Sequence, residues 1–110
     1  MRIIRGDNKT FTFQRKDKNK NVIIEKPDKM YLTIKENEYQ KQALIQKTFD
    51  DGIRFEDATY YVDFVPEDTD DLSFGEYVYD IEIINGNIVK TIKKDIFVIE
   101  SEVTYKENEV

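Results

Sequence analysis

The chain has 110 residues and a formal net charge of −6, from 17 lysines and arginines against 23 aspartates and glutamates. It contains no histidine, cysteine or tryptophan. This excludes a serine or cysteine nucleophile paired with histidine, a disulfide and a standard zinc site. The length predicts one domain. We assign this domain to residues 1–104 and interpret 105–110 as a C-terminal tail or linker.

Aromatic side chains make up 13% of the residues, which favours a folded core over a disordered chain. The mixed charge with an acidic excess argues against nucleic acid, whose phosphates would require a basic surface. No segment approaches the roughly 20 consecutive apolar residues that span a bilayer, and the N-terminus lacks the apolar core of a signal peptide. We therefore expect neither a nucleic-acid partner nor a membrane partner.

The first strand is expected around residues 1–5. Adjacent Ile3 and Ile4 place one apolar side chain on each face of this strand, so one can enter the core and the other needs cover. Because an edge strand carries unpaired N–H and C=O groups, we interpret Ile3 and Ile4 as a candidate assembly edge. The next strand is expected around Phe11 and Phe13, which flank Thr12.

Period-two alternation of apolar and polar residues predicts strands at 30–35, 60–65 and 77–84, each with one buried face. Further strands are expected at 43–49, 88–93 and 96–100. Residues 66–72, which begin with a proline followed by acids, predict a short helical turn that crosses between two sheets. Asn85-Gly86 predicts a type I′ hairpin turn. Short strands with frequent turns indicate an all-β sandwich or barrel rather than alternating strands and helices.

The stretch from Leu72 to Asp80 is the most informative. Gly75 precedes Tyr77 by two residues, and an inward-facing Tyr79 follows two residues later. This spacing resembles the tyrosine corner of immunoglobulin-like sandwiches, in which the tyrosine hydroxyl bonds to upstream backbone. We expect the Tyr77 hydroxyl to bond near 68–71. The predicted fold is an immunoglobulin-like antiparallel β-sandwich of seven to eight strands.

Three motifs that can carry chemistry have simpler structural interpretations. Arg5-Gly6-Asp7 matches an integrin-binding triplet, but it also suits a bend at a strand end. Residues 17–21 match part of a calcium loop but lack its glycine and carry lysines, so a hairpin turn is favoured. The acids at 67, 68, 70 and 71 suit a helix N-terminus better than a metal or a glycosidase site. We assign no catalytic, metal-binding or cofactor-binding residue.

Taken in order, these sequence features resemble those of the immunoglobulin-like N-terminal domain of tailed-phage and prophage baseplate proteins, the upper baseplate protein family. The opening Arg5-Gly6-Asp7-Asn8 before an aromatic strand matches the start of that family's pattern. The central run is matched by Thr69, Leu72, Gly75, Tyr77, Tyr79, Asp80 and Ile81, and the ending by Thr91-Ile92 and Glu102-Val103-Thr104. The structural fingerprint is Arg5, Gly6, Asp7, Leu72, Gly75, Tyr77, Tyr79 and Asp80.

The resemblance implies a non-enzymatic structural domain that mediates protein–protein assembly in a tail or baseplate. It implies other phage structural proteins as partners, no cofactor, and location in the virion after synthesis in the bacterial host cytoplasm. We expect weak or no self-association in isolation. The alternative is a carbohydrate- or host-surface-binding module, for which the candidate contact residues are Tyr31, Tyr39 and Tyr61. A carboxylate enzyme would instead need two acids that converge in a cleft.

Overall fold

The structure is a computed structural model that describes residues 1–103, so the tail predicted at 105–110 lies outside the described residues. The described chain is all-β, as predicted, with eight strands and one short helix. In chain order these are β1 (Arg2–Ile4), β2 (Lys9–Phe13), β3 (Lys29–Lys35), β4 (Ile45–Phe49), β5 (Gly52–Glu56), β6 (Thr59–Phe64), α1 (Pro66–Thr69), β7 (Gly75–Asn85) and β8 (Ile88–Glu100).

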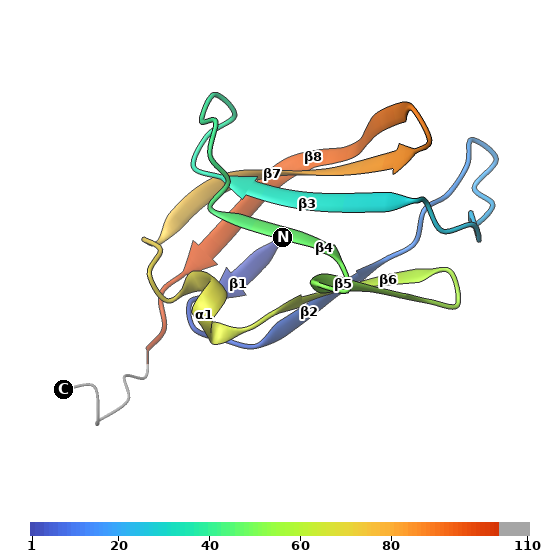
Figure 1. The fold of residues 1–110 in the computed structure, drawn as a ribbon. Helices are drawn as coiled ribbons and strands as arrows, with labels where there is room; N and C mark the ends of the chain where they lie inside the picture. Colours follow the sequence, from blue (N-terminus) through green and yellow to red (C-terminus); the bar gives the residue numbers. More distant parts are fainter. Residues whose placement is uncertain (104–110) are drawn as a thin grey trace.

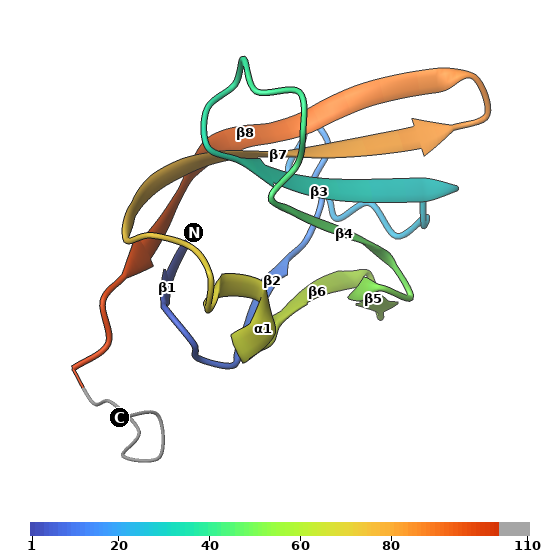
Figure 2. The same ribbon diagram turned by 60° about the vertical axis from the view of Figure 1, so that its left-hand side comes forward.

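All eight strands belong to one mixed sheet with the order β1-β8-β7-β3-β4-β5-β6-β2. The sheet curls over, so that β3, β4, β7 and β8 form one layer and β2, β5 and β6 form the other (Figures 1 and 2). The end strands β1 and β2 approach each other: the Lys9 ammonium donates to the Arg2 carbonyl at 2.7 Å. They do not pair, and the sheet is therefore a nearly closed barrel with one open side.

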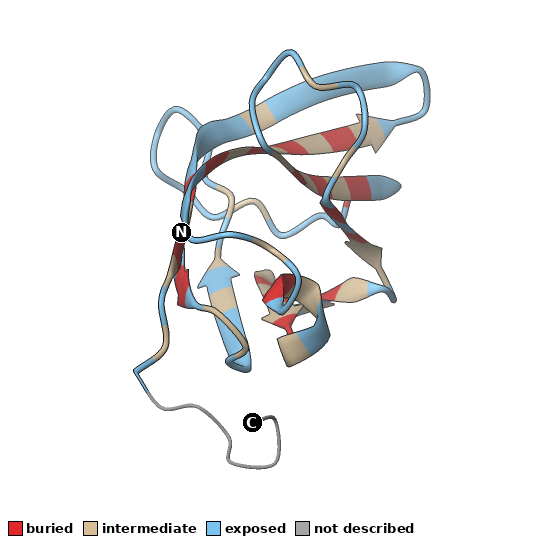
Figure 3. Ribbon diagram, turned by 90° about the vertical axis from the view of Figure 1, so that its left-hand side faces the viewer, coloured by how far each residue is buried: buried red, intermediate tan, exposed pale blue. Residues whose placement is uncertain are grey.

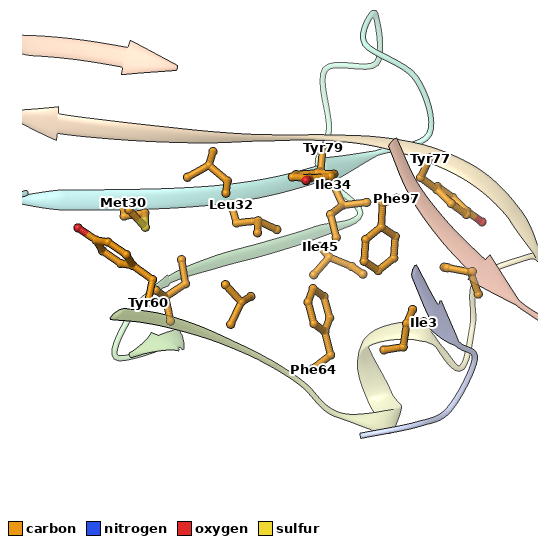
Figure 4. Packing of buried hydrophobic residues seen from close by; sticks show 14 of the residues in the cluster. Ile3, Met30, Leu32, Ile34, Ile45, Tyr60, Phe64, Tyr77, Tyr79 and Phe97 are labelled. Atoms are coloured by element: carbon orange, nitrogen blue, oxygen red, sulfur yellow. The ribbon is translucent and has the colours of Figure 1, made fainter. Parts of the chain in front are cut away.

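The core lies between the two layers. Met30, Leu32 and Ile34 alternate with less buried residues along β3, and β6 has the same pattern on the facing layer. Figure 4 shows these side chains meeting between the layers, with Phe64 below Phe97; their ring centroids are 5.4 Å apart. The buried hydrophobic residues are Ile3, Met30, Leu32, Ile34, Ile45, Ile53, Tyr60, Val62, Phe64, Tyr77, Tyr79, Ile81, Ile83, Phe97 and Ile99.

The strictly antiparallel pairing predicted for the sheet is wrong at two places. β1 runs parallel to β8, with Ile3 opposite Ile99, because the chain crosses to the other layer after β1 instead of turning back. β4 and β5 also pair in parallel at a sharp corner, where Asp50 and Gly52 have φ angles of 64° and 104°. This corner carries the sheet from one layer into the other.

The β7–β8 hairpin differs from the prediction in its turn and in its length. Asn85 pairs with Ile88, so the turn residues are Gly86 and Asn87, and of these only Gly86 has a positive φ, 57°. A positive φ at the first position alone is typical of a type II′ turn, not type I′. The two strands predicted at 88–93 and 96–100 form one 13-residue strand with an irregularity opposite Ile81 and Glu82.

Strand β5 and its hairpin to β6 were not predicted. Glu56 pairs with Thr59, and the turn residues Asp57 and Ala58 have φ angles of 50° and 62°. Two positive φ angles are typical of a type I′ turn. Alanine rarely adopts this conformation, so the sequence carries no turn signal there. The short helix predicted near Pro66 is confirmed as α1.

Candidate functional site

The open side of the sheet lies between β8 and β2. β1 pairs only with residues 98–100 of β8, and the Met1 backbone extends this contact to Ile96 and Val98. In the described chain, β2 pairs on one side only, with β6. One edge of β8 at 88–95 and one edge of β2 therefore have no strand partner. Figure 3 shows that the first half of β8, which follows the turn from β7, is exposed beside the buried positions of β7.

A cleft of about 750 Å³ occupies this open side. Its apolar lining includes Phe11 and Phe13 of β2, Ile81 of β7 and Ile92 of β8. Phe11 and Phe13 are opposite the buried Val62 and Tyr60 in the β2–β6 pairing, so their side chains point to the core. They remain partly exposed because no strand covers the free edge of β2.

The cleft is basic although the protein is acidic. Its charged lining residues are Arg15, Lys16, Lys18, Lys90 and Lys93 against one acid, Asp17. Lys93 lies 3.6 Å from Asp95, whereas Lys16, Lys18 and Lys90 form no ion pair within residues 1–103. A positive rim around an apolar floor attracts a ligand that has carboxylates and apolar groups.

The Asp17 carboxylate has a structural role at the end of the cleft. One of its oxygens accepts hydrogen bonds from the backbone N–H groups of Asn19 and Asn21, at 2.8 and 3.0 Å. Lys16 and Val22 form an isolated antiparallel bridge across the same turn. This geometry agrees with the hairpin turn favoured over a calcium loop. Within residues 1–103, no group of three or more acidic residues is placed to hold a metal ion.

Tyr60 is fully buried beneath the cleft and stacks on Phe13 with 4.9 Å between ring centroids. Burial raises the pKa of its phenol, and the nearby Arg15 guanidinium opposes this increase in pKa. No hydrogen bond of ordinary geometry reaches the hydroxyl from the described residues. Burial also raises the pKa of Tyr79, and the Asp95 carboxylate on β8 adds to the effect. Tyr60 belongs to none of the sequence motifs.

The structure brings several fingerprint residues together at the opposite end of the molecule. Arg5 forms an ion pair with Glu102 at 2.7 Å, covers the Phe74 ring at 4.2 Å and donates to the Leu72 carbonyl at 3.4 Å. The Arg5 guanidinium holds the pKa of the Glu102 carboxyl below its usual value. The Gly6 N–H donates to the buried Thr69 hydroxyl at 2.8 Å. Arg5 and Gly6 therefore fasten the β1–β2 turn to the segment between α1 and β7.

The Tyr77 hydroxyl bonds to upstream backbone, as expected, but at a different residue. Its side chain is buried, and its hydroxyl donates to the Ser73 carbonyl at 2.7 Å. The expected partner at 68–71 is wrong because α1 ends at Thr69 and the chain then runs past Tyr77 at Ser73. Gly75 begins β7 with a φ of 136°, and Tyr79 is buried. Asp7 is exposed, and Asp80 lies on the outer face of β7, away from this cluster.

The two isoleucines of the candidate assembly edge lie on opposite faces of β1. Ile3 is 1% exposed and belongs to the core, whereas Ile4 is 41% exposed. This division follows from the alternation of a strand. Ile4 is the residue that a partner could cover.

The acids around α1 do not converge on a site. Asp68 forms an ion pair with Lys47 at 2.7 Å, and it also accepts from the Val65 N–H at 2.9 Å. Asp68 thus caps the first turn of α1 and connects it to β4, which is the structural role that the sequence favoured.

A second, polar hollow of about 730 Å³ lies on the outer face of β3, β7 and β8, beside the loop at 36–44. Tyr31, Thr33, Asp80 and Lys94 line it. Tyr61 is on β6 in the other layer, where it contacts Arg54, and Tyr39 is 86% exposed in the loop. The three tyrosines considered for carbohydrate binding therefore do not share one surface.

Comparison with models of protein families, with curated proteins and with solved structures finds no significant match to this chain. In the part of the chain that the structure describes, no helix is long and apolar enough to cross a membrane.

Proposed function

We propose that this chain is a non-enzymatic assembly domain of a phage or prophage tail or baseplate, built on an immunoglobulin-like sandwich. The observation that carries the assembly function is the open side of the sheet, where two unpaired strand edges border an apolar cleft. Such edges are ready templates for pairing with another chain. The phage context depends on the sequence fingerprint. The partners of this domain would be other structural proteins of the virion.

The strand order supports the immunoglobulin-like part of this proposal. β2, β6 and β5 are neighbours in one layer, as are strands B, E and D of that fold, and β8, β7 and β3 correspond to strands G, F and C. On this correspondence Tyr77 stands at the start of strand F, where the tyrosine corner is expected. The bond from Tyr77 to Ser73 supports the same assignment.

Incorporation into particles tests the proposed function. Tails purified after prophage induction from the bacterium that encodes the chain should contain it, as detected by mass spectrometry. Ile4→Lys should remain folded and be lost from the particles, because a lysine would replace the apolar contact with a neighbour. Ile24→Lys is the matched control, since Ile24 is 68% exposed in a loop away from β1. Particles that lack the wild-type chain would contradict the proposal.

A carbohydrate- or host-surface-binding function is the second candidate, and the polar hollow beside Tyr31 is the observation that favours it. Its hydroxyl, carboxylate and ammonium groups are the donors and acceptors that sugars require. Binding to a glycan array that is lost in Tyr31→Ala would establish this alternative.

A further inference from the structure

The free edge of β8 continues beyond the start of β1. Ile96 and Glu100 accept hydrogen bonds from the backbone of Met1 and Arg5, and the Val98 N–H donates to the Met1 carbonyl at 2.9 Å. Residues 96, 98 and 100 therefore turn their backbone polar groups toward β1. Because backbone groups alternate along a strand, Lys94 turns its N–H and C=O toward the same side, at a point that precedes the start of β1.

β1 shows what this edge of β8 accepts. It is an extended segment that pairs parallel to β8 and places one side chain, Ile3, in the core. Another extended segment in line with β1 would lie between β8 and β2. It would meet the free edge of each strand and complete the barrel. Its inward side chains would contact Phe11, Phe13 and Ile92.

The charges around the cleft specify the occupant further. Lys16, Lys18 and Lys90 are exposed and unpaired within residues 1–103, and the half-buried Arg15 lines the same cleft. A basic rim on a protein of net charge −6 repels a second copy of the same cleft and attracts carboxylates.

We infer that the cleft binds an extended, acidic segment of a partner protein, in which apolar side chains alternate with carboxylates and which adds as a strand between β8 and β2. This inference rests on the proposed assembly function and names the kind of segment that the cleft would bind in the assembly. The main-chain hydrogen bonds would supply affinity, and the apolar floor and basic rim would supply specificity.

A model peptide tests the inference on the purified chain. The probe is an eight-residue peptide with capped ends in which valine alternates with glutamate, compared with one in which valine alternates with lysine. We expect the glutamate peptide to bind about tenfold more tightly or better by calorimetry, with an affinity that falls as salt is added. Backbone amide shifts in NMR spectra should concentrate in β2 and in residues 88–95.

Two pairs of variants separate backbone pairing from charge. Lys94→Pro removes an N–H from the free edge and should abolish binding, whereas Lys94→Ala keeps that N–H and should bind normally. Lys90→Glu should weaken binding by up to about fivefold, whereas Lys41→Glu, on the exposed loop at 36–44, should leave the affinity unchanged.

Four results would overturn the inference: no binding of either peptide, equal binding of both, shifts outside the cleft, or tighter binding of single-stranded oligothymidine than of the glutamate peptide. Absence of peptide binding by a chain that is incorporated into tails would refute the inference alone. Peptide binding by a chain that is absent from tails would refute only the proposed phage function.

Discussion

At the scale of single residues, Tyr77 connects the start of β7 to the chain that leads into it. Its ring is buried and its hydroxyl donates to the Ser73 carbonyl. Ser73 itself is exposed, so the bond competes with water and contributes what an ordinary intramolecular hydrogen bond does. The hydroxyl therefore stabilises the crossing from one layer to the other.

Tyr77→Phe should lower the free energy of unfolding by about 0.5–1.5 kcal/mol, because the Ser73 carbonyl exchanges its bond to the hydroxyl for one to water. Urea denaturation measures this change. Tyr39→Phe is the control, since this exposed loop residue should change stability by less than about 0.5 kcal/mol. Equal stability of Tyr77→Phe and the wild type would show that the corner bond does not contribute.

Ile3 and Ile4 differ in burial, so substitution by lysine should lower the free energy of unfolding at Ile3 and leave it nearly unchanged at Ile4. Ile3→Lys places an unpaired charge in the core and should cost more than about 3 kcal/mol or prevent folding. Ile4→Lys points into solvent and should change stability by less than about 0.5 kcal/mol. Thermal melting of both variants measures the difference, and similar melting temperatures would contradict the alternation observed in β1.

At the scale of elements, Asp63 connects three strands on the outer face of the lower layer. Both of its carboxylate oxygens accept from the Arg54 guanidinium of β5, at 2.7 and 3.0 Å, and one accepts from Thr10 of β2 at 2.7 Å. The hydrogen bond from Arg54, followed by that from Thr10, lowers the pKa of Asp63 below its ordinary value of 3.8. This cluster holds β2, a sheet edge, against β5 and β6.

Because the pKa of Asp63 is lower in the folded state, its contribution to stability is present above the ordinary value and is lost as the pH falls below about 4. Asp63→Asn should therefore reduce stability at neutral pH and flatten its decline between about pH 5 and 2.5. Denaturation across that range measures both effects. Arg54→Gln should give the same flattened profile, and a profile as steep as that of the wild type would contradict the assignment.

At the scale of the whole molecule, the open side of the barrel is the main departure from a closed fold. The basic rim of the cleft discourages self-association, since two identical clefts would place like charges together. We expect the isolated chain to be monomeric. Light scattering across a hundredfold dilution measures this, and an oligomer that persists at nanomolar concentration would contradict it.

We also expect no tightly bound metal, because Asp17 and Asp68 are engaged with backbone N–H groups and a lysine. Millimolar Ca²⁺ should leave the melting temperature unchanged. A rise of several degrees that a chelator abolishes would contradict this expectation.

The sequence alone was sufficient for the all-β class, most of the strands and the inward residues of each. Alternation is a local signal, and it reports directly which face of a strand is buried. The burial of Tyr77 and Tyr79 followed from it, whereas the short helix that begins at Pro66 followed from a proline with acids after it. The type II′ turn at Gly86 could not be predicted, because one Asn-Gly pair is compatible with more than one register of the turn.

Only the tertiary structure decided how the strands pair at long range. Three features depend on where segments distant in the sequence meet. They are the pairing of β8 with only three residues of β1, the corner between β4 and β5, and the free edge of β2. Alternation carries no information on which neighbour a strand finds, since both edges of a strand offer the same backbone groups. The cleft and its basic rim therefore could not be predicted from the sequence, because they form only where the tertiary structure places β2 and β8 on either side of the open barrel.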